Sequence, residues 1–195
     1  TRSQYQRRLG FRRAEFVEDD GFIFQMPNNA VIPDELDWRK EELVTHVKDQ
    51  GECGSCYAFS ATGALEGQHA RALGYIVELS EQNIIDCDDN EGGCHGGDMT
   101  TVFGYVKKNG GIDLEDAYPY EAEQGECRFN RSLVGATDTG YARIPSGNEE
   151  LLKAAVATIG PIAISFDASS VLFNAYGGGS LVFPCFDNGF PFCWY

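Results

Sequence analysis

The sequence predicts an α+β fold whose helical part precedes its β part along the chain, and three observations support this. Three segments have helical patterns: 56–73, 98–109 and 148–159. After Gly160-Pro161, the short apolar runs 162–166 and 180–183 are typical of strands and are separated by three consecutive glycines. No internal repeat is visible. We therefore expect two segregated lobes.

The helical elements follow from spacing and end signals. Residues 56–73, CYAFSATGALEGQHARAL, carry small and apolar side chains on nearly all sides of the first half, which indicates a buried central helix. In the second helix Asp98 is a capping residue, apolar residues recur at helical spacing from Met99, and Asn109-Gly110-Gly111 ends the pattern. The third helix has one apolar face that begins at Leu151.

A boundary is expected near residue 32. Val31-Ile32-Pro33-Asp34 indicates an extended entry into a new unit, whereas residues 1–31 show no clear period. We expect three parts: 1–31, a helical lobe over 32–136 and a β lobe over 137–195. Since the chain begins at Thr1 without a signal-like apolar segment, we expect it to be part of a longer precursor.

Charge is distributed unevenly. The net charge is −15, yet residues 1–13 hold five arginines and no acid, which leaves 10 basic and 30 acidic residues elsewhere. Such an acidic body excludes nucleic-acid binding through a basic face. A basic arm can lie against it and be loosened by salt or acid, although a solvated terminus would have the same charge. No apolar run approaches the roughly 20 residues of a membrane span.

Seven cysteines and one sequon indicate an oxidising route. The cysteine count is high and odd, and Asn130-Arg131-Ser132 is a glycosylation sequon. Sequons also arise by chance. Together these features favour the secretory pathway.

Cys56 is the candidate nucleophile. It begins the central helix, where the positive end of the helix dipole favours a thiolate. Gly54 and Ser55 leave room for a substrate backbone beside it. The Gln50 carboxamide and the Cys56 N–H would donate to an oxyanion in acyl transfer. This pattern favours a nucleophile over a buried structural cysteine.

The run from Gln50 to Ser60, QGECGSCYAFS, resembles the active-site segment of the papain family of cysteine proteases. Neighbouring segments resemble cathepsin L: IPDELDWR (32–39), VKDQG (47–51), SATGALEGQ (60–68), LSEQNIIDC (79–87), GCHGGDM (93–99) and EDAYPYEA (115–122). The resemblance covers roughly 32–183, and the preceding segment resembles the end of a propeptide. It implies a papain-like two-lobe fold with a complete helical left lobe and a truncated β-barrel right lobe.

The resemblance also implies roles for single residues. Cys56 would be the attacking thiolate of an endopeptidase that works through an acyl-enzyme, and Gln50 the oxyanion donor. The implied substrate-binding residues are Gly96, Gly97, Met99 and Ser165, the last two in the pocket for the second residue before the cleaved bond. Tyr57 stands where the family usually has tryptophan. The implied disulfides are Cys53–Cys94 and Cys87–Cys127, and Asn130 is the expected glycosylation site.

The implied partners are peptide or protein substrates, cystatin-like inhibitors and the chain's own propeptide. A lysosomal or secreted monomer without cofactor or metal is expected.

The sequence has no histidine at the position where the family carries its catalytic base. A histidine is expected about 130–150 residues after the nucleophile, near residue 186, followed by an asparagine. The chain there reads FDNGFPFCWY. His69 lies about 20 Å along the helix from Cys56, and His46 precedes VKDQG, so His95 beside Cys94 is the remaining candidate. We expect an inactive or severely weakened enzyme.

The aromatic tail from Phe183 differs from the family, and Cys185 lacks its family partner unless Cys193 replaces it. We interpret the tail as an abnormal ending, from altered splicing or a shifted frame. A β lobe that stops there would leave apolar faces uncovered.

Two alternatives belong to other functional classes. A non-catalytic binding protein would keep the cleft and occlude peptides or inhibitors without cutting them. A thiol–disulfide oxidoreductase would use Cys53 and Cys56, and a Cys53–Cys94 disulfide would exclude it. A zinc site from Cys87, Cys94 and His95 is disfavoured because these cysteines have expected partners.

Overall fold

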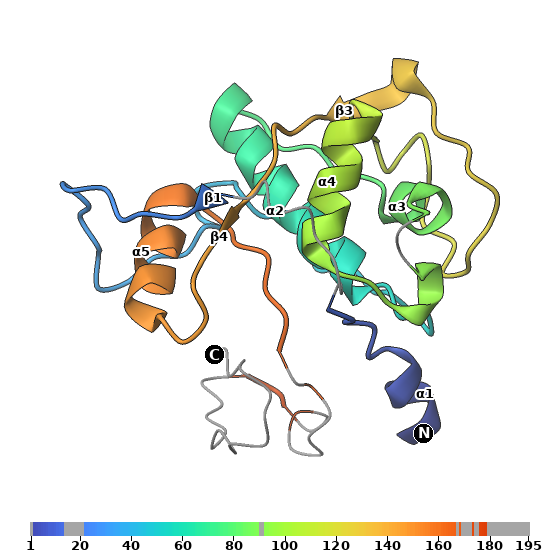
Figure 1. Cartoon of the computed structure of the whole chain (residues 1–195), viewed down its shortest axis with the longest axis horizontal. Coiled ribbons are helices and arrows are strands. Elements are labelled where there is room, and N and C mark those ends of the chain that lie inside the picture. Colours follow the sequence, from blue (N-terminus) through green and yellow to red (C-terminus); the bar gives the residue numbers. More distant parts are fainter. Residues whose placement is uncertain are drawn as a thin grey trace.

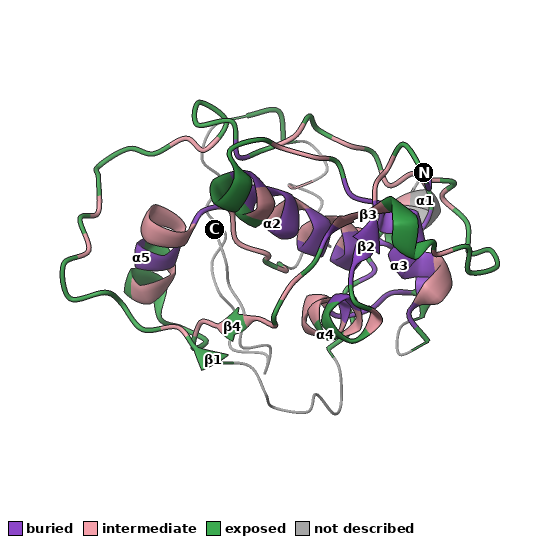
Figure 2. Cartoon of the chain, turned by 90° about the horizontal axis from the view of Figure 1, so that it is seen from above, coloured by how far each residue is buried: buried purple, intermediate pink, exposed green. Residues whose placement is uncertain are grey.

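The computed structural model describes residues 2–13, 22–89, 92–166, 168, 173 and 176–178. Its elements are α1 (Arg2–Arg7), β1 (Phe22–Ile23), α2 (Cys56–Leu73), α3 (Glu81–Cys87), the 3-10 turn η1 (Gly93–His95), α4 (Met99–Asn109), β2 (Ile112–Asp113), the 3-10 turn η2 (Arg131–Leu133), β3 (Val134–Ala136), β4 (Ala142–Arg143) and α5 (Glu149–Ile159). The α+β class is confirmed. Helix α2 lies between α5 and the α3–α4 side of the molecule in both views (Figures 1 and 2).

The expected helices form with their expected end signals. Helix α2 has the expected bounds and ends at Gly74, whose φ of 82° is left-handed. The Asp98 carboxylate accepts from the Thr100 N–H and caps α4, and Asn148 caps α5 in the same way. Helix α3 was not expected from the pattern. Its N-terminus is fixed by Ser80, whose hydroxyl accepts from the Asn83 N–H at 2.9 Å.

The core surrounds the N-terminal half of α2, much of which is buried in Figure 2. Tyr57, Ala58 and Ala61 are at most 1% exposed. The small alanine side chains let α3 and α4 approach closely, and Ile84, Val102 and Val106 fill the contact. Burying an aliphatic side chain of this size stabilises the fold by about 1.5–3 kcal/mol. This packing holds the N-terminal turn of α2 in a fixed place.

The strands are short and form two pairs. Strand β1 pairs in parallel with β4 (Phe22 with Ala142), and β2 pairs antiparallel with β3 (Ile112 with Ala136). Two short elements, α1 and β1, lie within residues 1–31, where the sequence showed no clear period. The pairing of β1 with β4 ties the N-terminal part of the chain to the segment that follows the helical lobe.

The strand expected at 162–166 does not form. Its backbone instead bonds to a helix side chain: the Ile164 N–H donates to Ser60 Oγ at 3.1 Å, and Ser60 Oγ donates to the Ile164 carbonyl at 2.9 Å. The segment thus lies along α2 rather than in a sheet. The other expected strand, 180–183, and the aromatic tail lie outside the described residues.

A cavity of about 840 Å³ opens between the C-terminal half of α2, the segment 134–144 and α5. Leu65, Phe103 and Ile159 are among its mostly apolar lining residues. Two polar atoms in the lining residues, His69 Nε2 and Asp138 Oδ2, are buried without a hydrogen-bond partner. Burial raises the pKa of Asp138 to about 7, although the Gly140 N–H opposes this. The described residues therefore leave the apolar lining of this cavity uncovered.

Candidate active site

Cys56 is the first residue of α2 and is half-buried, and it is the one free thiol among the described cysteines. The structure joins Cys53 to Cys94 and Cys87 to Cys127, the two pairs that the resemblance implied. The disulfide at Cys94 holds the η1 turn beside the start of α2, where the Gly54 N–H also donates to the Cys94 carbonyl at 2.9 Å. The nucleophile candidate therefore lies where η1 and α2 meet.

The thiol is not activated in the way that its position at the helix N-terminus led us to expect. Burial raises the pKa of Cys56, and the backbone N–H groups of Gly10, Tyr57 and Cys56 only partly oppose this. The expectation of a lowered pKa is thus wrong for this state of the chain. Burial outweighs the helix dipole, and one of the groups that act on the sulfur, Gly10, belongs to the N-terminal segment.

None of the three histidines acts on the Cys56 thiol. His46 Nδ1 lies 3.0 Å from Glu78 Oε1, and both side chains are exposed. The His69 ring packs edge-on against Tyr75 at 5.1 Å. His95 ends the η1 turn and is exposed. No side-chain base therefore reaches the thiol from the described residues.

The side-chain amide of Gln50, the expected oxyanion donor, is already hydrogen-bonded. Gln50 Nε2 donates to the Arg8 carbonyl at 3.0 Å and to the Cys53 carbonyl at 2.8 Å. The turn that follows requires a positive φ of 62° at Gly51, and its N–H is bonded to Asp49 Oδ1 at 2.9 Å. A backbone carbonyl of the N-terminal segment thus accepts from the donor that we assigned to an oxyanion.

The η1 loop is paired with the same N-terminal segment. The Gly97 N–H donates to the Gly10 carbonyl at 2.8 Å, and the Arg12 N–H donates to the Gly97 carbonyl at 2.9 Å. Phe11 and Gly97 form a parallel bridge. A side chain at Gly96 would lie 2.3 Å from the Gly10 oxygen. Both glycines therefore act as a surface on which an extended backbone lies.

The N-terminal segment, residues 5–13, crosses the thiol at close range. A Cβ at Gly10 would lie 1.8 Å from the Gly54 carbonyl oxygen, so only glycine fits there. Arg7 Nη1 contacts Glu52 Oε2 at 3.1 Å, and Arg8 Nη1 contacts Asp49 Oδ1 at 4.0 Å. The Tyr5 hydroxyl donates to the Ala168 carbonyl. The basic arm thus lies against the acidic body across the candidate site.

The two residues expected in the specificity pocket come from separate elements. Met99 is the first residue of α4 and packs against the core. Ser165 is half-buried and follows Ile164, whose backbone is bonded to Ser60 of α2. Their joint role in one pocket stays a prediction.

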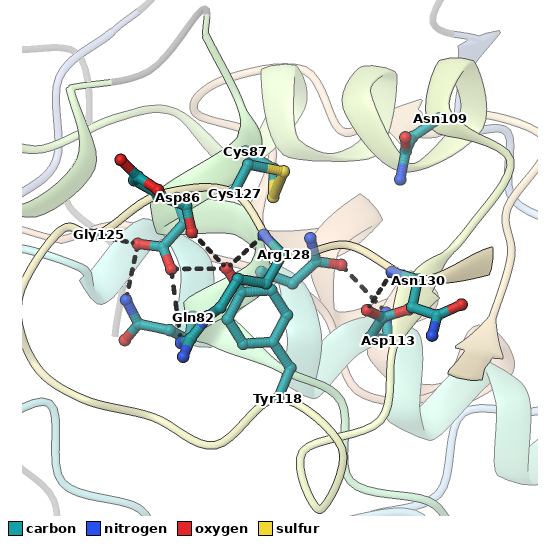
Figure 3. The surroundings of a disulfide bond; sticks show 12 residues. Gln82, Asp86, Cys87, Asn109, Asp113, Tyr118, Gly125, Cys127, Arg128 and Asn130 are labelled. Atoms are coloured by element: carbon teal, nitrogen blue, oxygen red, sulfur yellow. Dashed lines mark hydrogen bonds and ion pairs between the residues drawn. A yellow bond between two sulfur atoms is a disulfide. The ribbon is translucent and has the colours of Figure 1, made fainter. Parts of the chain in front are cut away.

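The disulfide Cys87–Cys127 closes a loop that runs from the end of β2 back to α3 (Figure 3). The Asp86 carboxylate accepts from Gln82 Nε2, the Gly125 N–H and the Tyr118 hydroxyl at 2.7–2.8 Å. The Arg128 guanidinium lies 4.6 Å above the Tyr118 ring. The segment 115–130 is therefore held firmly against α3.

Asn130, the expected glycosylation site, is exposed at the end of this loop. Its Oδ1 accepts from the Ser132 N–H at 3.1 Å and from Ser132 Oγ at 2.8 Å. Its own N–H donates to Asp113 Oδ2 at 2.9 Å (Figure 3). The sequon is thus accessible on the surface.

Sequence reasoning missed two groups around the site. Lys48 Nζ lies 2.8 Å from Glu66 Oε1 and 2.7 Å from Glu81 Oε1, and both carboxylates are 1% exposed. Burial raises the pKa of Glu81 although Lys48 opposes it. This cluster fixes the segment before Gln50 against α2 and α3. The second group is Tyr120, whose hydroxyl donates to the Gln50 carbonyl at 2.8 Å.

No group of three or more His, Cys, Asp or Glu side chains able to hold a metal exists among the described residues. Cys87 and Cys94, which were considered as zinc ligands, are each in a disulfide. None of the described helices has the length and apolar character needed to cross a membrane.

Comparison with known proteins extends these observations. The family model described as "Papain family cysteine protease" matches residues 32–187. A "Cathepsin L-like" protein of Caenorhabditis elegans is 51% identical over 181 residues, 91% of this chain and 54% of that protein. Human cathepsin L2 is 45% identical over 92% of this chain and 54% of its own length. The chain thus spans about half the length of these relatives.

Among solved structures, digestive procathepsin L2 from larval midgut of Tenebrio molitor has a TM-score of 0.90 at 38% identity. The match covers 98% of this chain and 64% of that one. It therefore includes the N-terminal segment as well as the body.

Proposed function

We propose that this chain, which belongs to the papain family of cysteine proteases, is a cathepsin L-like endopeptidase chain held in a covered state by its own N-terminal segment. Its cathepsin-like relatives identify it as a cysteine protease by family, and its fold is papain-like. The observation that carries the proposal is the pairing of the N-terminal backbone with Gln50 and Gly97. A substrate backbone would need the same two groups.

In the proposed reaction, the Cys56 sulfur attacks the carbonyl carbon of a peptide bond and forms an acyl-enzyme. The Gln50 amide and the Cys56 N–H donate to the oxygen on which negative charge develops. Gly96 and Gly97 pair with the substrate backbone, and Met99 and Ser165 line the pocket for the second residue before the cleaved bond. The Arg8 carbonyl occupies the Gln50 donor in the covered state and mimics the reacting carbonyl.

Turnover by this chain is proposed to be weak. A thiol of raised pKa that no side-chain base among the described residues reaches provides little thiolate at neutral pH. A base would also have to deliver a proton to the leaving amine. Acylation by a reactive substrate is therefore expected to exceed hydrolysis of an ordinary peptide.

Release of the N-terminal segment is proposed to be favoured by salt, with a modest effect. Screening by salt would weaken both ion pairs, that of Arg7 with Glu52 and that of Arg8 with Asp49. Each pair is exposed and is worth about 0–1 kcal/mol. Salt would thus shift the equilibrium by up to about 2 kcal/mol, roughly 30-fold. Backbone pairing with Gly97, the Gln50 bond to the Arg8 carbonyl and the Tyr5 bond to the Ala168 carbonyl contribute to the remainder of the attachment.

The second candidate is a non-catalytic protein that binds cystatin-like inhibitors through the same cleft. The raised pKa of Cys56 favours it, because binding needs no thiolate. An oxidoreductase that uses Cys53 and Cys56 is less well supported, since Cys53 is bonded to Cys94. The disulfides and the exposed sequon support a lysosomal or secreted location.

The deciding experiment uses the full chain and its Gly10→Ala variant, in which the new Cβ cannot coexist with the Gly54 carbonyl. Both are incubated with a fluorogenic peptide that has an apolar residue second before the cleaved bond, with Cys56→Ala as the blank. Cleavage by Gly10→Ala above the blank supports the peptidase. Tight cystatin binding with no cleavage supports the binding protein instead.

A further inference from the structure

Tyr120 lies in the loop after β2 and reaches across to the candidate active site. Its ring packs edge-on against Phe59, in the first turn of α2, with a centroid distance of 4.9 Å. Its backbone N–H donates to Glu115 Oε1 at 2.9 Å. The loop itself is fixed against α3 through Tyr118 and the Cys87–Cys127 disulfide (Figure 3). The Tyr120 hydroxyl is thus held from several sides.

The Tyr120 hydroxyl is hydrogen-bonded to two residues close to the proposed oxyanion donors, namely Gln50 and Ser55. It donates to the Gln50 carbonyl at 2.8 Å and lies 2.7 Å from Ser55 Oγ. A hydroxyl has one hydrogen, so the tyrosine that donates to Gln50 must accept from Ser55. The result is a directed chain from Ser55 to Tyr120 to Gln50. The hydrogen bonds of such a chain polarise and strengthen one another.

Ser55 is placed as the N-cap of α2 but does not cap it. Its side chain makes no capping hydrogen bond, whereas Ser80 caps α3 and Asp98 caps α4. Serine is among the preferred capping residues, so an uncommitted Ser55 hydroxyl would be expected to accept from the first turn. Here the hydroxyl is fully buried and donates to Tyr120. The N–H groups of Cys56 and Tyr57 are left to act on the sulfur.

We propose that Tyr120 is a positioning residue of this site. Its hydroxyl fixes the backbone of Gln50, which directs the carboxamide toward the reacting carbonyl. It also draws the Ser55 hydroxyl away from the first turn of α2, which leaves those N–H groups directed at Cys56. The inference rests on the proposed function, because it assigns the geometry of the oxyanion donors in that reaction.

The test compares two reactions of the same thiol. Acylation by a p-nitrophenyl ester forms a sulfur–carbon bond, breaks the ester C–O bond and releases p-nitrophenolate. This reaction develops an oxyanion but needs no base for its leaving group. Alkylation by iodoacetamide displaces iodide and develops no oxyanion. The ratio of the two rates therefore reports on oxyanion stabilisation and is independent of the thiolate fraction.

The variants are made in the full chain with Gly10→Ala, so that the thiol is uncovered. Removing one oxyanion donor costs about 10²–10³-fold, and a misplaced group costs up to about 10²-fold. We expect Tyr120→Phe to lower the ratio by at least about tenfold, with Gln50→Ala as the reference for full loss. Tyr105→Phe is the control, because its hydroxyl also has a buried partner, Asn83, outside the cleft.

Each outcome decides the matter. If Tyr120→Phe keeps the parental ratio while Gln50→Ala lowers it, or if it slows both reactions equally, Tyr120 is not a positioning residue. If Gln50→Ala also keeps the ratio, the oxyanion assignment and this inference both fail. Should Tyr120→Phe not fold, Ser55→Ala, which interrupts the same chain, must lower the ratio by at least about threefold. Absence of peptide cleavage would count against the proposed function alone, since ester acylation stays measurable.

Discussion

Replacing Gly10 with alanine should uncover Cys56 without any change in the body of the protein. The new Cβ would lie 1.8 Å from the Gly54 oxygen and 2.3 Å from its carbon, and both are backbone atoms. The segment must therefore move away and lose its two hydrogen bonds with Gly97. At about 0.5–1.5 kcal/mol each, these bonds contribute about 1–3 kcal/mol to the covered state. The uncovered population should rise by about 5- to 150-fold.

The assay is the rate at which iodoacetamide labels Cys56, followed by mass spectrometry of the intact chain at pH 8. Gly104→Ala is the matched control, because Gly104 lies exposed in α4 with open space around its Cβ position. We expect the control to react at the parental rate and to be as stable or slightly more stable. Equal labelling of Gly10→Ala and the parent would show that the N-terminal segment does not cover the thiol, which would refute the reasoning.

Three further predictions follow from exposed or buried polar groups. Because Asp138 has its pKa raised to about 7 by burial, its contribution to folding stability is retained below the ordinary carboxyl pKa of 3.8 and lost as the pH rises through 7. Asp138→Asn should therefore raise the melting temperature at pH 8 and leave it unchanged at pH 3.5; an equal shift at both would contradict this assignment. Arg7→Gln combined with Arg8→Gln should speed Cys56 labelling by up to about 30-fold at low salt and much less at 1 M salt, since both ion pairs are exposed; the labelling rate measured at the two salt concentrations decides. Expression in a secretory host should glycosylate Asn130, seen as a mass loss on amidase treatment that Asn130→Gln abolishes; an unchanged mass in the parent would disprove it.

Patterns of local origin were predictable from the sequence. The bounds of α2 and the cap of α4 at Asp98 follow from apolar spacing and end signals, and the structure has them. Helix α3 has only seven residues, too few to display a helical period, so no signal predicted it. The 162–166 run has the β-rich composition of a strand, but its backbone is bonded to Ser60, about a hundred residues earlier.

Features that depend on tertiary packing were not predictable. The helix dipole at Cys56 suggested a lowered pKa on local grounds, but burial of the thiol has the larger effect and raises the pKa. Tyr120 lies 70 residues after Gln50 in the sequence, and its contact arises from the fold of the intervening helices. The pairing of Gly10 with Gly97 likewise joins distant segments. A motif identifies which residue types are present, whereas their electrostatic state depends on what covers them.

The central proposal is that Cys56 is the nucleophile of a papain-family site in which no side chain among the described residues acts as a base on the thiol. Its most direct test is the pH dependence of Cys56 alkylation in the Gly10→Ala chain, with Cys56→Ala as the blank. We predict a rate that rises only as the pH approaches or exceeds the ordinary thiol pKa of about 8.5, with no plateau in acid. Rapid alkylation that persists well below pH 6 would require a thiolate paired with a nearby cation and would contradict the claim.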